Sequence, residues 1–341
     1  MENFSNCKNF IGIDISKDTF DVAVYANGAK KPELKKFTND RNGFKRLGSW
    51  LAKLGLAMSD SAVCMESTGI YSLHLQEYLH DNNVKYCIEN PLAIKRSAGI
   101  RRCKTDKCDS VMIAEYLRTN RERLNESALP AKSISELQAL VRERNLYAKQ
   151  MAMLKTSLET KDYEPKEIEA RKNGIIASLK KEMEKCEKQM MDVIGADESL
   201  SKSFKLITSI PGISIVNAVD TIVATRNFTA FDSPRKYACY VGVAPFEHSS
   251  GSSVDGGAHV SPMCKSLYKS HLSMAARSAI QHDGWMKAYY KRKMKEKMGG
   301  SKSRQDAKRA HAIVINAIKF KLIMRMFAVI RDESPYKVLN N

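Results

Sequence analysis

Over positions 9–118, segments with the hydrophobic pattern of strands are followed by segments in which that pattern and the pattern of helices take turns. Short apolar runs and alternating stretches predict strands, whereas apolar residues three or four positions apart predict amphipathic helices. The predicted strands are 9–15, 18–25, 33–38, 62–66 and 84–88, and the predicted helices are 41–54, 71–82 and 107–118. Three hairpin-linked strands followed by alternating helices and strands predict a mixed α/β sheet with helices on its faces.

The middle of the chain carries apolar residues at heptad spacing. A polar segment at 121–133, which contains Pro130, marks the boundary before them. The two apolar sets are Leu137, Leu140, Tyr147, Met151, Leu154 and Leu158, then Ile176, Leu179, Met183, Cys186, Met190 and Val193. The first set is interrupted at Arg144, and the second is unbroken. This pattern predicts two long helices that form either an antiparallel hairpin within one subunit or a coiled-coil seam for a second subunit.

The last third of the chain is expected to be mainly helical. Residues 205–214 have the pattern of a helix, a tight turn and a second helix, and 266–282 and 307–330 have amphipathic helical periodicity. Between them, 241–265 is rich in Gly and Ser, which is typical of a loop or of short strands. These changes of pattern divide the chain into three predicted domains, 1–130, 131–200 and 201–341.

The charge of the chain narrows the class of partner. Its 341 residues include 56 Lys or Arg and 38 Asp or Glu, a formal net charge of +18 at pH 7. This excess favours a polyanion, nucleic acid first and an anionic membrane surface second. No membrane-spanning helix is expected, because the best candidate, 310–330, is interrupted by Lys319, Lys321 and Arg325. Without a signal-like N-terminus or a Cys-x-x-Cys pair among eight cysteines, we expect a cytoplasmic protein with reduced thiols.

Four carboxylates stand where two predicted strands end and one predicted helix begins. Asp14 ends the first strand, Glu66 ends the fourth, and Asp106 and Asp109 lie three positions apart on nearly the same helix face. Acids at strand ends lie at the edge of a sheet, where mixed α/β folds bind ligands. Divalent cations would neutralise four converging charges, and Mg²⁺ suits hard oxygen ligands. The four acids together predict a two-metal site for phosphoryl transfer, although each alone is better explained as a cap or surface charge.

Two basic segments are candidates for contacts with a phosphate backbone. The first, 95–104, lies between Glu66 and Asp106 and contains five cations; the second, 287–309, has ten Lys or Arg and two acids, a net charge of +8. Both favour nucleic-acid binding, with a solvated basic loop as the alternative for the first. The candidate contact residues are Lys95, Arg96, Arg101, Arg102 and Lys104, together with Lys291, Arg292 and Lys293.

Two short motifs in the last third are compatible with phosphate chemistry. Gly212, in a turn between two helices, is placed as in helix-hairpin-helix modules, where backbone N–H groups at a helix N-terminus bind phosphate. An ordinary glycine cap is the alternative. The segment 249–253 has the sequence Ser-Ser-Gly-Ser-Ser, which by composition alone indicates a flexible linker. Its functional interpretation is a nucleophilic serine whose phosphoserine link conserves bond energy, so that rejoining needs no ATP.

Taken together, these motifs resemble a known family. The segments 11–17, 65–71 and 104–109, which contain the four acids, are similar to the DEDD-motif transposases of bacterial insertion sequences, a group that includes the pilin-gene invertase. The segments 209–213 and 240–251 resemble the C-terminal transposase region of that family. The resemblance covers essentially the whole chain in the same order.

The resemblance implies a fold and a set of site residues. It implies an N-terminal RNase-H-like (RuvC-like) domain, a coiled-coil connector and a mainly helical C-terminal domain with a Gly/Ser-rich active-site loop. The four acids would bind Mg²⁺, or Mn²⁺ in its place, and Ser250, which precedes a glycine, would be the nucleophile, with Ser249 as its rival. The chain departs from the family's Ser-Lys-x-Gly at 261–265, which reads Ser-Pro-Met-Cys-Lys.

The resemblance also implies partners. Members recombine double-stranded DNA, donor and target, and some are guided by a structured RNA. Their composite sites join the acids of one subunit to the serine of another, so a homo-oligomer, a dimer or a tetramer, is expected. Such a protein would be cytoplasmic and associated with the nucleoid when bound to DNA.

Three other functions remain open. A RuvC-like metal-dependent nuclease would use the four acids and leave Ser250 idle. An actin-like ATPase or sugar kinase also begins with Gly-Ile-Asp on a hairpin, and 255–257 (Asp-Gly-Gly) would serve it as a phosphate loop, but it explains neither the heptads nor the basic C-terminal region. A non-catalytic nucleic-acid-binding scaffold is disfavoured because all four acids are present.

Overall fold

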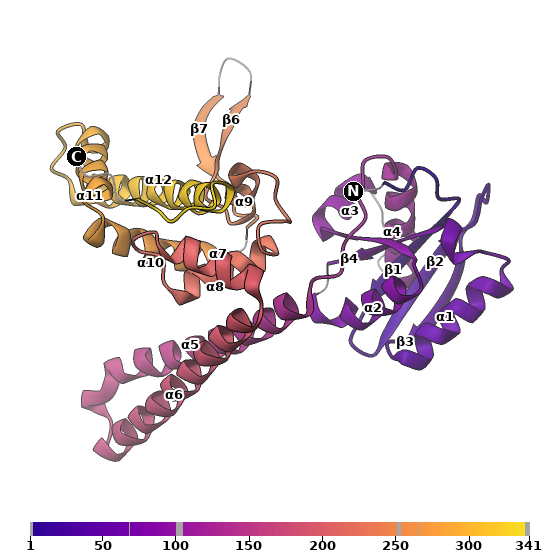
Figure 1. Cartoon of the computed structure of the whole chain (residues 1–341), viewed down its shortest axis with the longest axis horizontal. Coiled ribbons are helices and arrows are strands. Elements are labelled where there is room, and N and C mark those ends of the chain that lie inside the picture. Colours follow the sequence, from indigo (N-terminus) through magenta and orange to yellow (C-terminus); the bar gives the residue numbers. More distant parts are fainter. Residues whose placement is uncertain (1–2, 68, 100–104, 251–253, 265, 338–341) are drawn as a thin grey trace. The chain divides into compact units, whose positions relative to one another are not determined.

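The chain folds into two compact units, Met1–Leu129 and Pro130–Asn341 (Figure 1). The computed structural model describes residues 3–67, 69–99, 105–250, 254–264 and 266–337, with the backbone alone at 161, 248–250 and 254–258. The first unit is α/β and the second is mainly helical, as the sequence predicts. Within the described residues, no helix combines the length and the apolar character that crossing a membrane requires.

The N-terminal unit is built on a mixed five-stranded sheet in the order β3-β2-β1-β4-β5. All five predicted strands are present: β1 (Asn9–Ile15), β2 (Thr19–Tyr25), β3 (Glu33–Thr38), β4 (Ser61–Glu66) and β5 (Lys85–Glu89). The first three form antiparallel hairpins, and β1, β4 and β5 run parallel. Because β1 and β4 are parallel neighbours, their carboxyl ends reach the same edge of the sheet.

Helices cover both faces of this sheet (Figure 1). The unit's helices are α1 (Arg41–Lys53), α2 (Leu73–Asp81), α3 (Pro91–Ser97) and α4 (Asp106–Asn120), with short 3₁₀ turns at Met58–Asp60 and Gly69–Ser72. Apolar side chains of α1 and α2 pack on one face of the sheet, and those of α3 and α4 pack on the other. Three of the helices were predicted. The fourth, α3, takes up the first part of the segment expected to be a basic loop.

Gly12 allows α4 to lie close against β1. A side-chain carbon at this position would come within 2.2 Å of Ser110 O and Ala114 N on α4, far inside any tolerable contact. The missing side chain therefore lets α4 pack directly on the strand, with Ala114 fully buried. Since Asp14 follows Gly12 by two residues, this close packing also brings the start of α4 toward the end of β1.

The C-terminal unit begins with a long helical hairpin (Figure 1). Helices α5 (Lys132–Ser157) and α6 (Lys166–Ala196) are joined by a 3₁₀ segment, Leu158–Tyr163. Cys186 and Met190 of the second heptad set are buried, and Leu137 of the first is buried as well. The interruption of the first set is explained by Arg144, whose Nε lies 2.7 Å from Oε1 of Glu187 and so ties α5 to α6. Of the two predicted arrangements, the antiparallel hairpin within one subunit is therefore present.

The rest of this unit is a helical bundle that carries one two-stranded hairpin. Its elements are α7 (Glu198–Thr208), α8 (Ile215–Thr225), α9 (Pro234–Tyr240), β6 (Pro245–Ser250), β7 (Val254–Val260), α10 (Ser266–His282), α11 (Gly284–Met298) and α12 (Arg304–Arg331). Helices α8, α10 and α12 contribute about half of its buried core, and α12 contributes more than any other helix. The hairpin of β6 and β7 occupies the segment expected to be a loop or short strands, and α9 and α11 were not predicted as helices.

The cysteines follow the expectation of reduced thiols with one exception. Six cysteines in the described part of the chain are free, and four of these are buried. Cys108 is disulfide-bonded, so the expectation is wrong there. It lies half-exposed in the first turn of α4, where a thiol is accessible, unlike the buried cysteines of the sheet.

Candidate active site

The four acids lie at one edge of the N-terminal sheet. Asp14 is the penultimate residue of β1 and Glu66 is the last residue of β4. The parallel register pairs Ile13 with Met65, so Asp14 and Glu66 follow directly from paired positions on neighbouring strands. Both are half-buried. The sequence-predicted acids of the two strands are therefore neighbours in the fold.

The other two acids come from the first turn of α4. Thr105 caps this helix: its Oγ1 accepts a hydrogen bond from Cys108 N at 3.3 Å, and its carbonyl accepts one from Asp109 N at 2.9 Å. A residue with an extended backbone and a side-chain oxygen at this position fixes where a helix begins. Asp106 is exposed and Asp109 is half-buried, and the two lie three residues apart on one face of the helix.

The four acids act on one another electrostatically. The pKa of Asp14 is raised to about 6, first because burial disfavours its charged form and then because of the negative charges of Asp109, Glu66 and Asp106. A carboxyl that is repelled by three others is one that a cation would stabilise. The sequence prediction that these acids gather at one place is thus supported by the electrostatics of the fold.

A fifth acid and a lysine, which the sequence analysis missed, belong to the same cluster. Asp21 on β2 is the register partner of Asp14 and is buried. Lys36 on β3 places its Nζ 3.0 Å from Oδ2 of Asp21 and 3.6 Å from Oδ2 of Asp106. The pKa of Lys36 is raised, chiefly by its hydrogen bond to Asp21. One signal was present in the sequence, since Asp21 interrupts the apolar residues of a strand.

The donor chemistry of this cluster suits Mg²⁺ or Mn²⁺. All four acids offer hard carboxylate oxygens, which these ions prefer. Among the described residues, no three His, Cys, Asp or Glu side chains are gathered closely enough to ligate one metal ion. Asp109, Glu66 and Asp106 nevertheless raise the pKa of Asp14, so the four acids are neighbours. Binding a metal would therefore require the side chains to move inward, and Lys36 would have to release Asp106.

The basic segment that links β5 to α4 is only partly described. Lys95 and Arg96 lie in the last turn of α3, so this part is helical and not a loop. Both are exposed. The predicted contacts Arg101, Arg102 and Lys104 lie outside the described residues.

Gly212 has a packing role. It adopts φ +94°, and a side-chain carbon there would come within 2.6 Å of Ala275 O and Ala279 N on α10. Only glycine fits this left-handed turn and this close approach. Its role in phosphate binding stays a prediction.

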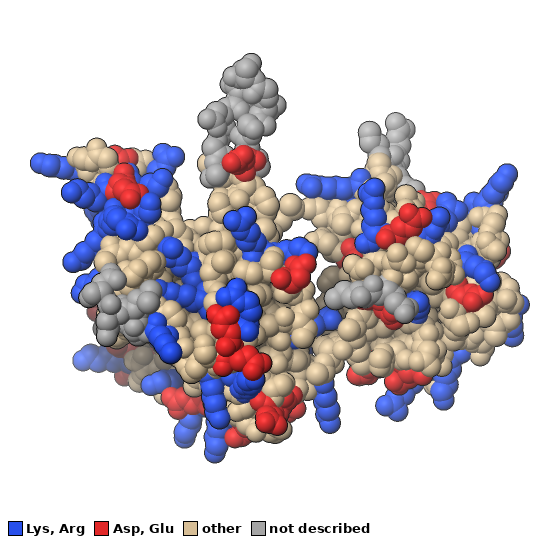
Figure 2. Space-filling model, turned by 45° about the horizontal axis from the view of Figure 1, so that its top comes forward, with Lys and Arg blue, Asp and Glu red and all other residues tan. Residues whose placement is uncertain are grey.

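The second basic segment forms α11 and the start of α12. Lys291, Arg292 and Lys293 lie on α11, whose only buried residue is Met286. Trp285 and Tyr289 of the same helix stack at 5.5 Å with an angle of 9° between their rings. Figure 2 shows Lys and Arg side chains spread over this face of the molecule, including the end at which Figure 1 places α11. Both rings are half-buried, and cations interleaved with aromatic rings are typical of nucleic-acid surfaces.

Ser250 is the last residue of β6. Its backbone pairs with Val254, and Ser249 pairs with Asp255, in an antiparallel hairpin with a register shift between Glu247 and Ser249. The tip of the hairpin, 251–253, lies outside the described residues. Ser250 and the four acids belong to different units of the chain.

Comparison with known families identifies the class of protein. The model of a DEDD transposase family, described as a transposase, matches residues 11–161, and that of the transposase IS116/IS110/IS902 family matches residues 204–291. The chain belongs to the DEDD transposases and recombinases of the IS110 type, and it is a DNA-processing enzyme. The predicted resemblance is confirmed.

Two relatives match nearly the whole chain. The pilin gene-inverting proteins of Moraxella bovis and Moraxella lacunata are each 28% identical to it over 339 residues, which is 96% of this chain and 98% of the relative. The similarity therefore extends across both units and includes α6, which lies between the two family matches.

Proposed function

We propose that this chain is the recombinase of an insertion sequence, which cuts and rejoins double-stranded DNA through a serine–phosphate intermediate. The observation that carries the proposal is the gathering of the four acids at one sheet edge in a transposase of the IS110 type. The strand order β3-β2-β1-β4-β5, with only β2 antiparallel to its two neighbours, supports the RNase-H-like assignment of this unit.

The four acids and the serine would divide the chemistry. The acids would hold Mg²⁺ or Mn²⁺, which would neutralise charge on the scissile phosphate and polarise it. Ser250 Oγ would attack phosphorus, so that a serine–phosphate bond forms as a phosphate–sugar bond breaks and the leaving sugar oxygen takes up the proton. Attack by a second strand's hydroxyl then reverses the step. One phosphodiester replaces another, so no ATP is consumed.

Strand exchange in a purified system tests this function. The chain is mixed with Mg²⁺, donor and target DNA and the transcript of the element's non-coding end, and recombinant junctions are measured. We expect junctions without ATP, none with a chelator, and none after the RNA is removed, because we propose that a structured RNA guides the enzyme. Nicked DNA without junctions would support the RuvC-like nuclease instead, and ATP hydrolysis would support the kinase-like alternative.

We also propose that the hairpin of α5 and α6 joins subunits of a dimer or tetramer. The distal part of the hairpin is incompletely covered within one chain: Leu146, Met153 and Ile175 are 53%, 65% and 51% exposed. Ile176 and Leu179 of the unbroken heptad set are only half-buried. Exposed apolar side chains that cluster on both helices of one hairpin favour a protein interface.

Charged substitutions in the second heptad set should separate the subunits. In a variant with Leu179→Glu and Met183→Glu, two carboxylates would have to be buried without partners at the interface, which is costly. Light scattering with nucleic acid bound should show that the mass of the complex falls to that of one chain with its nucleic acid. Lys181→Glu, on an exposed position between them, is the control for the change in charge. A monomeric unchanged protein would contradict the proposal.

The affinity for nucleic acid should fall steeply with salt. Each neutralised phosphate of duplex DNA contributes a slope of about −0.9 to log K against log salt. Replacing Lys291, Arg292 and Lys293 by Gln should weaken binding to all sequences alike and reduce the slope by roughly 2 to 3. Fluorescence anisotropy across a salt series measures both quantities. The idea fails if the slope is flat, or if only one sequence loses affinity.

A further inference from the structure

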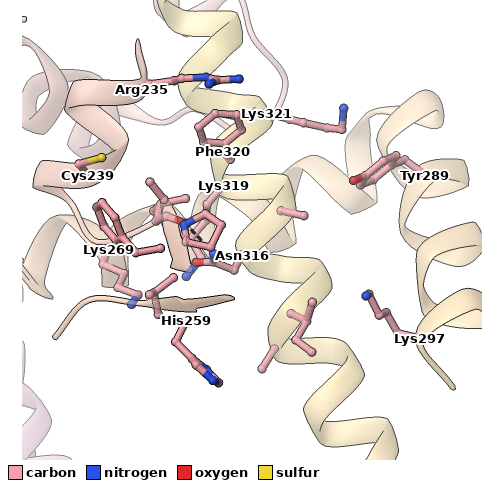
Figure 3. Close-up of a pocket in the computed structure, with 18 residues that line it drawn as sticks. Arg235, Cys239, His259, Lys269, Tyr289, Lys297, Asn316, Lys319, Phe320 and Lys321 are labelled. Carbon is pink, nitrogen blue, oxygen red and sulfur yellow. Dashed lines mark hydrogen bonds between the residues drawn. The ribbon is translucent and has the colours of Figure 1, made fainter. Parts of the chain in front are cut away.

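A basic groove lies beside the serine-bearing hairpin in the C-terminal unit (Figure 3). Its volume is about 1180 Å³, and it lies between α9, α10, α11, α12 and the base of the hairpin. The basic groove is lined by five cations and by no Asp or Glu among the described residues: Arg235, Lys269, Lys297, Lys319 and Lys321. A concave surface with charges of one sign focuses an electrostatic field and attracts the opposite charge.

Lys319 is the cation that most requires a ligand. It is only 6% exposed, and its Nζ donates a hydrogen bond to Ser273 Oγ at 3.0 Å. No carboxylate in the described part of the chain lies within ion-pair distance of it. Burial, and after it the positive charges of Lys269 and Arg277, lower the pKa of Lys319 to about 8. A buried ammonium with only cations around it is unfavourable until an anion enters.

The rest of the lining suits a nucleic-acid strand better than a free anion. Phe246, Tyr289 and Phe320 contribute aromatic rings, on which unpaired bases can stack. Asn316 donates its amide to Val243 O at 2.8 Å, while its Oδ1 is buried and has no partner in the described residues. That oxygen can accept a hydrogen bond from a base amino group or a sugar hydroxyl.

The hairpin that carries Ser250 also lines the basic groove. Phe246 and His259, which line the groove, are register partners across β6 and β7. Ser250 follows Phe246 by four residues on the same strand, a distance of roughly 13 Å at about 3.3 Å per residue. A strand in the groove would thus continue toward the tip of the hairpin.

We propose that the basic groove binds the sugar–phosphate backbone of an unpaired nucleic-acid strand, with one phosphate on Lys319 and bases stacked on the aromatic lining. The proposal extends the proposed function, since it assigns the place where the strand next to the serine is held. Binding itself needs neither a metal nor the serine.

The test measures binding of labelled 12-nucleotide strands to the full chain by fluorescence anisotropy. Lys319→Met keeps the length of the side chain and removes the charge. It should weaken binding of oligo-dT and of oligo-U roughly 10- to 100-fold, the effect of losing one charge-assisted hydrogen bond. A blunt DNA duplex of equal length should change less than about twofold. Lys269→Met, at a more accessible position of the groove, should also weaken strand binding.

Thermal stability separates a ligand-binding lysine from a structural one. The Tm of Lys319→Met should equal or exceed that of the unchanged protein, because an unpaired buried charge has been removed. Lys181→Met, an exposed lysine on α6, is the control for net charge and should bind as the unchanged protein does.

Three results would overturn the proposal: strand binding by Lys319→Met equal to that of the control, a lowered Tm, or an equal loss with duplex. Asp14→Asn and Ser250→Ala should bind strands normally. A chain that binds strands in this way and yet fails to exchange them would refute the proposed function alone.

Discussion

Asp14→Asn is expected to reduce strand exchange on the order of 10⁴-fold, the scale on which a member of a catalytic unit is lost. Asparagine keeps the size of the side chain and removes the charge at the centre of the four acids. Because Glu66, Asp106 and Asp109 all repel the Asp14 carboxylate, the same cluster should lose affinity for a divalent cation when that charge is removed. Quantitative measurement of recombinant junctions checks the loss.

The same variant should be at least as stable as the unchanged protein without metal. The folded-state pKa of Asp14 is raised from 3.8 to about 6, so the folded state binds more protons than the unfolded state between these values. The contribution of Asp14 to stability therefore falls as pH rises from about 4 to 6 and stays lower above that range. Asp14→Asn removes this penalty, so its Tm at pH 7 should be unchanged or higher.

The increase in stability on binding Mg²⁺ can be measured independently of recombination. At 100 times its Kd, Mg²⁺ should stabilise the unchanged protein by about 2.7 kcal/mol, and Asp14→Asn should lose most of this gain. Asp18→Asn, at an exposed position four residues further along, is the control and should keep both the gain and the activity. Near-normal exchange by a folded Asp14→Asn protein would exclude Asp14 from the chemistry.

Most of the fold could be predicted because hydrophobic periodicity and burial agree. Most apolar residues of the five strands are buried, with Leu34 of the edge strand β3 as an exposed exception. Helix α1 shows the expected apolar face, with Phe44, Leu47 and Leu51 buried. Helix α11 could not be found in this way, because Met286 is its only buried residue and its exposed positions are filled by cations. Helices α3 and α9 have seven residues each, too few to establish a period.

The candidate site was predictable only where the acids stand at the ends of elements. Asp14 and Glu66 end strands, and Asp106 begins a helix, so their position along the chain indicates an edge of the sheet. The contact of Lys36 with Asp21 depends on the register of β2 with β3. Its contact with Asp106 depends on the close packing at Gly12 that brings α4 to the sheet. The basic groove collects residues from positions 235 to 321, and no spacing in the sequence relates them.

Ser250→Ala is expected to abolish the covalent protein–DNA intermediate and, with it, strand exchange. Ser250 is the last residue of β6, immediately before the tip of a hairpin whose base lines the basic groove. A serine hydroxyl is a weak nucleophile unless a neighbouring group or a metal activates it. Because the four acids belong to the other unit, the proposed chemistry requires Ser250 and the acids, of one chain or of two subunits, to act on the same phosphate.

Mass spectrometry of protein trapped on nicked DNA identifies the residue that carries the phosphate. In the unchanged protein the adduct should map to Ser250, and Ser249→Ala should retain both the adduct and most of the strand exchange. With Ser250→Ala the adduct should be absent, and junctions should fall on the order of 10⁴-fold, while binding of unpaired strands in the basic groove stays normal. If the adduct maps to Ser249, the nucleophile is the neighbouring serine. If Ser250→Ala still cleaves DNA at the normal rate without any adduct, water is the attacking group and the enzyme works as a metal-dependent nuclease.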